Sequence, residues 1–149
     1  MFNIALYQPD IPQNTAAIIR ICSCFDTTLE IIEPCGFYLN DKRIKRVAMD
    51  YLDTSRIITY KSYKNFLIEK KNSRIILMTT KAKKNYINFK FKHNDTILFG
   101  RESEGVPKMV HSKSNQRLKI PLKNNARSLN IATAVAITLS EALRQNPNL

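Results

Sequence analysis

Three segments in the last third of the chain carry the residues with the clearest chemical potential. They are 99–106, 120–122 and 126–132, which read FGRESEGV, IPL and ARSLNIA. The glycine- and serine-marked turns follow strand-like runs, so backbone N–H groups and a helix N-terminus would face a crevice at the carboxyl end of a sheet. Neither turn has the glycine spacing of a phosphate loop or of the dinucleotide fingerprint. We therefore expect a small ligand other than an ordinary nucleotide.

These segments, with the N-T pair at 14–15 and the I-I-R run at 18–20, resemble the three motifs of the SPOUT class of RNA methyltransferases. The opening stretch 3–15, NIALYQPDIPQNT, with 31–37 and 41–43, is similar to the minimal TrmL type within that class. The resemblance covers nearly the whole chain. It implies a homodimer that transfers a methyl group from S-adenosyl-L-methionine to the ribose 2′-OH of the tRNA wobble nucleotide, cytidine or uridine 34, and releases S-adenosyl-L-homocysteine.

The resemblance also implies which positions line the cofactor pocket. Gly100 would let the ligand approach the backbone closely, and Met78 and Ile120 would offer apolar contact to adenine. Glu102 would face the sulfonium or hold the backbone of the third segment, and a purely structural cap role stays open for it. Without the resemblance, Met78 and Ile120 are equally typical of core packing. The implied cofactor positions are Met78, Gly100, Glu102, Ile120, Ser128 and Leu129.

Three further residues are the catalytic candidates that the resemblance implies: Arg20 as base or activator, Asn14 to orient it, and Asn130 to place the ribose. A guanidinium stays protonated near neutral pH and is a poor base. We therefore expect Arg20 to hold the neighbouring RNA phosphate. The proton acceptor stays open between phosphate, water and a transiently neutral guanidine. The alternative for Arg20 is an ordinary surface arginine on the first helix.

Length and charge agree with a small RNA-binding protein. A chain of 149 residues predicts one domain, with no separate RNA-binding module. It has 24 Lys and Arg residues against 12 Asp and Glu, a net charge of +12, which favours a polyanion partner such as tRNA. Nucleotide bias in a genome is the alternative source of this charge, and a solvated basic surface is the alternative for each cluster. The candidate RNA contacts are Lys42, Arg43, Lys45, Arg46, Lys81, Lys83 and Lys84.

The remaining composition predicts a cytoplasmic protein without a metal. Cys22, Cys24 and Cys35 form no metal or disulfide pattern, and we expect them to be buried, small apolar residues in a reducing compartment. His93 and His111 lack partners at metal-ligand spacing and receive no role. No signal segment or membrane-spanning stretch is recognisable.

Strand-like and helix-like stretches alternate along the chain, which predicts a mostly parallel sheet with helices on both faces. Asn14 and Ser128 are the expected N-caps of the first and last helices. We expect Ile131, Val135, Leu139 and Ala142 to spread around much of the surface of the last helix, which predicts burial against a second subunit. The C-terminal deep trefoil knot is implied only by the resemblance, since threaded chains are otherwise rare. We expect strands at 2–7, 29–32, 56–60, 74–79, 96–99 and 118–121, and helices at 15–25, 41–49, 63–71 and 128–143.

Other functions stay open at this stage. The same chemistry could act on another tRNA position or on ribosomal RNA, or the chain could be a catalytically silent RNA-binding member. Intact Arg20 and Asn130 argue against silence. A doubly wound nucleotide-binding or regulatory domain lacks its acidic cluster or phosphate loop. Ala16-Ala17 and Thr133 replace residues that relatives often carry as glycine or asparagine, which puts substrate choice and rate in more doubt than cofactor binding.

Overall fold

The computed structural model describes residues 1–48, 50–51 and 55–147. Its strands form a seven-stranded sheet in the order β3-β2-β1-β6-β4-β7-β5, and every described pairing of neighbours is parallel. The expected parallel sheet is therefore confirmed. The strands are β1 (Asn3–Tyr7), β2 (Thr28–Ile32), β3 (Ile57–Tyr60), β4 (Ile75–Met78), β5 (Lys84–Asn85), β6 (Thr96–Phe99) and β7 (Gln116–Lys119).

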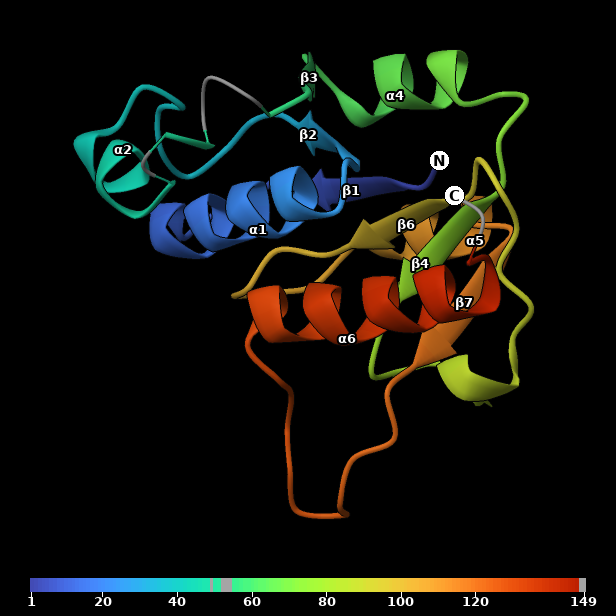
Figure 1. The fold of residues 1–149 in the computed structure, drawn as a ribbon. Helices are drawn as coiled ribbons and strands as arrows, with labels where there is room; N and C mark the ends of the chain where they lie inside the picture. The colour runs from blue at the N-terminus through green and yellow to red at the C-terminus, as the bar shows by residue number, and fades with distance from the viewer. Residues whose placement is uncertain (49, 52–54, 148–149) are drawn as a thin grey trace.

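Helices cover both faces of this sheet (Figure 1). On one face α1 packs against α2 and α6. On the other face α4 and α5 contribute Phe66 and Val110 to a second apolar cluster. The sequence does not predict α5 or β5, because elements this short carry too little periodicity. Met49, the expected last residue of the second helix, lies outside the described residues. The helices are α1 (Pro12–Cys24), α2 (Lys42–Ala48), α4 (Tyr63–Glu69), α5 (Lys108–Lys113), α6 (Ile131–Gln145) and the 3₁₀ turn η1 (Tyr86–Asn88).

The pairing of the central strands brings the carboxyl ends of β1, β4, β6 and β7 level with one another. β4 and β6 are buried along their whole length, as expected for apolar strands covered on both faces. Leu6 and Met78 both lie level with Phe99, and Leu118 lies level with Met78. The segments that follow β1, β4, β6 and β7 therefore leave the sheet side by side at its carboxyl edge.

The start of each long helix differs from the sequence expectation. α1 begins at Pro12, after Ile11 as N-cap, so Asn14 is inside the first turn and is not the cap. Proline suits the first helical position because its φ is already helical. It lacks an N–H group, but an N–H at this position would have no partner within the helix. α6 is capped by Asn130, whose Oδ1 accepts from the N–H groups of Ala132 at 2.9 Å and Thr133 at 3.3 Å. Ser128 lies before this cap.

The apolar residues of α6 lie mainly on one face of the helix. Val135, Leu139 and Ala142 are fully buried in the chain's own core, and Ile131 packs against that core. The expectation that they surround the helix is wrong, because spacings of three, four and seven residues return to the same side. These residues are covered by the sheet and by α1, so they give no argument for a second subunit.

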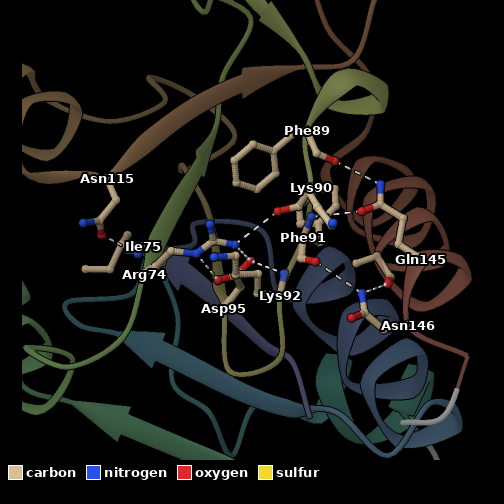
Figure 2. Close-up of polar contacts among 11 residues, drawn as sticks. Arg74, Ile75, Phe89, Lys90, Phe91, Lys92, Asp95, Asn115, Gln145 and Asn146 are labelled. Atoms are coloured by element: carbon tan, nitrogen blue, oxygen red, sulfur yellow. Dashed lines mark hydrogen bonds and ion pairs between the residues drawn. The ribbon is translucent and has the colours of Figure 1, made fainter.

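The carboxyl end of α6 is tied to the segment before β6 (Figure 2). Gln145 accepts from the Phe91 N–H at 2.9 Å and donates to the Phe89 carbonyl at 3.0 Å. Asn146 donates to the Phe91 carbonyl at 3.4 Å. The same segment is held from the other side by Arg74, which pairs with both carboxylate oxygens of Asp95. The 86–95 segment is therefore fixed to the sheet and to α6 at once.

The cysteines follow the expectation only in part. Cys22 is buried and Cys35 is half-buried, and burial raises the pKa of the Cys22 thiol to about 12. Cys24 is exposed, so its expected burial is wrong, because the last residue of α1 points away from the core. Among the described residues, no helix is both long and apolar enough to cross a membrane.

The tie at the end of α6 can be tested by Gln145→Ala. This change leaves the Phe91 N–H and the Phe89 carbonyl without their partner, and we expect it to lower the free energy of unfolding by about 1–3 kcal/mol. Urea denaturation measures the loss. Arg144→Ala is the matched control, because Arg144 is exposed and its ion pair among the described residues is with Glu141 on the same helix. Equal stability of the two variants would contradict the role of Gln145.

Candidate active site

A cavity of about 530 Å³ opens at the carboxyl edge of the sheet, beside the ends of β4, β6 and β7. All three sequence motifs reach it. Asn14 comes from α1, Glu102 from the turn after β6, and Asn130 from the start of α6. All six positions that the resemblance implied for the cofactor line this cavity: Met78, Gly100, Glu102, Ile120, Ser128 and Leu129.

The turn after β6 is built by two glycines. The backbone groups of Arg101 and Gly105 bond to each other in both directions, at 3.0 and 2.9 Å. A Cβ on Gly100 would lie 2.6 Å from the Gly105 carbonyl carbon, and Gly105 has a φ of +69°. The close approach that Gly100 allows is therefore made in part by the protein's own backbone. This is a second reason for glycine at this position, and its expected role in ligand approach stays a prediction.

A chain of hydrogen bonds joins the three motifs. Glu102 Oε1 accepts from Asn14 Nδ2 at 3.0 Å, and Asn14 Oδ1 accepts from Asn130 Nδ2 at 2.9 Å. Asn130 in turn caps α6. Glu102 Oε2 accepts from the Asp10 N–H at 3.0 Å. Glu102 thus holds the first motif, and the expectation that it holds the backbone of the third segment is wrong.

Two carboxyl groups lie together in this network. The Glu102 N–H donates to Asp10 Oδ1 at 3.2 Å, and the Ser103 hydroxyl donates to Asp10 Oδ2. Burial and the neighbouring Asp10 raise the pKa of Glu102, whereas the contact with Glu102 and the donated hydrogen bonds lower the pKa of Asp10. Asp10 is therefore the group that carries the negative charge most firmly.

The other walls of the cavity are apolar on one side and cationic on another. Met78, Ile120 and Leu129 are buried or half-buried and could accept a flat ring such as adenine. Lys81 and His111 also line the cavity. Burial, followed by the charges of Lys81 and Arg117, lowers the pKa of His111. Sequence reasoning gave His111 no role, because its place on the wall depends on α5, which the pattern does not predict.

Arg20 stands apart from this cavity. It lies on α1, is exposed, and its guanidinium carbon is 5.4 Å from the centre of the Tyr51 ring. It follows Asn14 by six positions, which places the two side chains about 120° apart around the helix. Asn14 bonds to Glu102 and Asn130. These hydrogen bonds do not connect Asn14 to Arg20, and the expectation that Asn14 orients it stays a prediction.

The candidate RNA contacts form two separate exposed groups. On α2, Lys42, Lys45 and Arg46 are exposed, and Arg43 pairs with Asp41, which lowers the pKa of that carboxyl to about 2. After β4, Lys81, Lys83 and Lys84 are exposed, and Lys84 Nζ lies 5.1 Å from the centre of the Phe89 ring. Lys81 is the member that also faces the cavity. Within the described residues, no group of three His, Cys, Asp or Glu side chains could hold a metal ion.

The sequence model of the SpoU rRNA methylase family matches residues 1–140. The chain belongs to this family of RNA methylases. It is similar to proteins named tRNA (cytidine(34)-2′-O)-methyltransferase. The one from Beijerinckia indica is 46% identical over 145 residues, covering 95% of this chain and 90% of that protein. The one from Escherichia coli K12 is 35% identical over 147 residues, covering 97% and 94%.

Solved structures are also similar to this chain. One described as giving structural insights into the 2-OH methylation of C/U34 on tRNA superposes with a TM-score of 0.95 at 33% identity, covering 100% of this chain and 98% of that one. The SpoU methyltransferase AviRb from Streptomyces viridochromogenes, solved in complex with AdoMet, gives 0.89 at 19% identity, covering 98% and 58%. The second likeness concerns the fold alone.

The role of the glycine turn can be tested in the absence of any ligand. We expect Gly100→Ala to lower the free energy of unfolding by about 1–3 kcal/mol, because the added methyl group overlaps the Gly105 backbone. Gly105→Ala adds a Cβ with no atom within 4 Å, so it isolates the cost of the left-handed backbone, about 1 kcal/mol. Urea denaturation of the free protein compares them. A Gly100→Ala protein as stable as the wild type would return Gly100 to a role in ligand approach alone.

Proposed function

We propose that this chain is an S-adenosyl-L-methionine-dependent methyltransferase that modifies the ribose 2′-OH of the wobble nucleotide, cytidine or uridine 34, of tRNA. The observation that carries the proposal is the cavity in which all three motifs meet, joined through Glu102, Asn14 and Asn130. The relatives and the solved structure with the highest similarity given above are named for this reaction.

The cavity fits the cofactor in size and chemistry. Met78, Ile120 and Leu129 form an apolar wall for adenine. The turns around Gly100 and Ser128 place backbone groups at the same cavity, and Glu102, which also lines it, would present a carboxylate to the cationic sulfonium. Two neighbours of the same fold were solved with AdoMet bound. When bound, the cofactor supplies the methyl group. S-adenosyl-L-homocysteine is then the product.

The protein side chains then have to align the ribose and handle its proton. Alignment alone supplies much of the acceleration of such a displacement. Asn130 and Asn14 lie at the cavity with fixed amides, where they would place the ribose. Arg20, outside the cavity and exposed, would hold the RNA phosphate next to the target through its planar guanidinium. The phosphate, water and the guanidine remain the candidate proton acceptors.

The two basic groups would bind the tRNA backbone. Contacts from α2 and from the segment 81–84 position RNA without reading its sequence. Lys81 connects the second group to the cavity, so a phosphate bound there would lie beside the cofactor. The candidate contacts remain Lys42, Arg43, Lys45, Arg46, Lys81, Lys83 and Lys84.

Three further features belong to the same proposal: a C-terminal trefoil knot, a homodimer and a cytoplasmic location. The knot is supported by the segment 86–95, which lies against the end of α6 and bonds to Gln145. The dimer is supported by Ile137, which lies on α6 about 180° from the buried face and is only partly covered in the single chain. No metal takes part in this proposal.

Methylation of unmodified tRNA tests the function directly. The purified protein, S-adenosylmethionine and tRNA should yield a ribose methyl group at position 34, located by mass spectrometry of nuclease fragments. Ribosomal RNA is the matched control substrate. A methyl group that appears only at another tRNA position or only in ribosomal RNA would overturn the choice of substrate while keeping the chemistry.

Arg20→Ala tests the catalytic role of that residue. Because Arg20 does not line the cavity, cofactor affinity measured by calorimetry should stay nearly unchanged. The single-turnover rate at saturating RNA should fall on the order of a hundredfold or more. Arg20→Lys should restore little, because an ammonium lacks the planar two-point contact. Lys83→Ala, by contrast, should weaken RNA binding and lower its salt slope by about one. Wild-type turnover in Arg20→Ala would remove Arg20 from the mechanism.

The dimer is tested by light scattering at micromolar concentration, where we expect twice 17.2 kDa. Ile137→Asp should shift the particle toward the monomer, because it places a charge in the proposed interface. Ile68→Asp is the matched control, since Ile68 is 58% exposed on α4 across the sheet. A folded, active wild-type monomer would overturn the dimer.

A further inference from the structure

Asp10 makes an unusual set of contacts for a residue outside the cavity wall. It lies in the loop between β1 and α1, and its contacts with the turn after β6 run in both directions. Its N–H donates to Glu102 Oε2 at 3.0 Å, and its Oδ1 accepts from the Glu102 N–H at 3.2 Å. Its Oδ2 accepts from the Ser103 hydroxyl. One side chain and its own backbone thus hold both the turn and the Glu102 carboxylate.

The Asp10 backbone is itself held in place. Gly36 packs so closely that a Cβ there would lie 2.9 Å from Asp10 Cα. The Gly36 N–H donates to the Pro9 carbonyl at 2.9 Å, and the Gln8 N–H donates to the Ile32 carbonyl at 2.8 Å. The loop is therefore anchored to the end of β2 and the turn that follows it. Because the Asp10 backbone is fixed, its hydrogen bonds fix the position of Glu102.

That position sets the direction of the whole hydrogen-bond chain. An ionised carboxylate only accepts hydrogen bonds, so Asn14 must turn its Nδ2 toward Glu102 and its Oδ1 toward Asn130. Asn130 must then donate through Nδ2, which leaves its Oδ1 to cap α6. The Asn14 amide has one orientation because Glu102 presents only acceptor oxygens to it, and the Asn130 amide is oriented both by Asn14 and by the N–H groups that it caps. A shift or rotation of Glu102 would release the Asn14 amide and weaken its bond to Asn130.

We propose that Asp10 is a positioning residue for methyl transfer, which fixes Glu102 and through it the Asn14 and Asn130 amides at the mouth of the cavity. The inference rests on the proposed function, since it assigns Asp10 to the same reaction. It predicts that the hydrogen bonds of Asp10 matter for turnover more than its charge does.

The surroundings of Glu102 allow a direct physical readout. Asp10 faces it from the loop before α1, and Arg101 and Glu104 are the charged neighbours in its own turn. α1 and α6 present the amides of Asn14 and Asn130. Arg101 bonds to Gln8 and pairs with Glu104. The pKa of Glu102 is raised by burial and by Asp10, so removal of the Asp10 charge should lower it.

The experiment compares Asp10→Ala, Asp10→Asn and the control Asp26→Asn, which removes an exposed carboxylate paired with Arg56 far along the chain. Single-turnover methylation of tRNA is measured at saturating cofactor and RNA, with cofactor affinity measured separately by calorimetry. The pKa of Glu102 is followed by ¹³C NMR of side-chain-labelled glutamate. Thermal melting reports whether each variant is folded.

We expect Asp10→Ala to lower the saturated rate on the order of tenfold or more, because a small misplacement of the aligning groups is costly. Asp10→Asn can still accept from the Glu102 N–H, so it should restore the rate to within about threefold while the pKa of Glu102 falls. Asp26→Asn should change neither quantity.

Wild-type turnover in Asp10→Ala would overturn the proposal. An equal loss in Asp10→Ala and Asp10→Asn would also overturn it, since the charge and not the hydrogen bonds would then matter. If Asp10→Ala does not fold, Asp10→Asn and the NMR titration still decide: an unchanged Glu102 pKa contradicts the contact. Failure of the wild type to methylate tRNA would instead overturn the proposed function. The NMR titration would still test the contact between Asp10 and Glu102, because it does not depend on methylation.

Discussion

The site depends on one carboxylate that accepts hydrogen bonds from a segment about ninety positions away along the chain. Glu102 joins Asp10 and Asn14, and Asn14 passes the connection to Asn130. Without this carboxylate the Asn14 amide and the Asp10 N–H would lose their acceptor, although α1 would still pack against α6. The sheet brings the three segments near one another, and the acceptor fixes how their side chains face.

The cavity that results is defined by backbone geometry as much as by side chains. Gly100 and Gly105 let a short turn close on itself, and both line the cavity. Glu102 and Lys81 both line the cavity, and Asp10 bonds to Glu102 from outside its wall. A cationic sulfonium and an anionic phosphate would therefore be drawn to different residues of the same opening.

Much of this could be predicted from the sequence, for identifiable reasons. The buried strands are apolar runs, so the local pattern predicts them. The family resemblance, and not the local pattern, selects the six expected cofactor positions, all of which line the cavity. Asparagine is a typical N-cap, so the sequence predicts that role for Asn14, although Pro12 starts the helix earlier. The sequence does not single out Asp10, because an aspartate between prolines is typical of a turn and its partners lie in another motif. β5 and α5 depend on tertiary contacts, and such short segments have too little periodicity to be predicted from the sequence.

The hydrogen bonds between α6 and the segment 86–95 affect the order in which the chain can fold during its synthesis. During synthesis the ribosome delivers Phe89 and Phe91 long before Gln145 and Asn146, which are their partners in the folded chain. Asn14 and Glu102 likewise wait for Asn130. The growing chain can form β1, β4 and β6 early, and Asn130 can join Asn14 once the start of α6 has emerged. The segment 86–95 receives its partners only with the last turn of α6, so the two ends of this helix would be fixed in sequence at the close of translation.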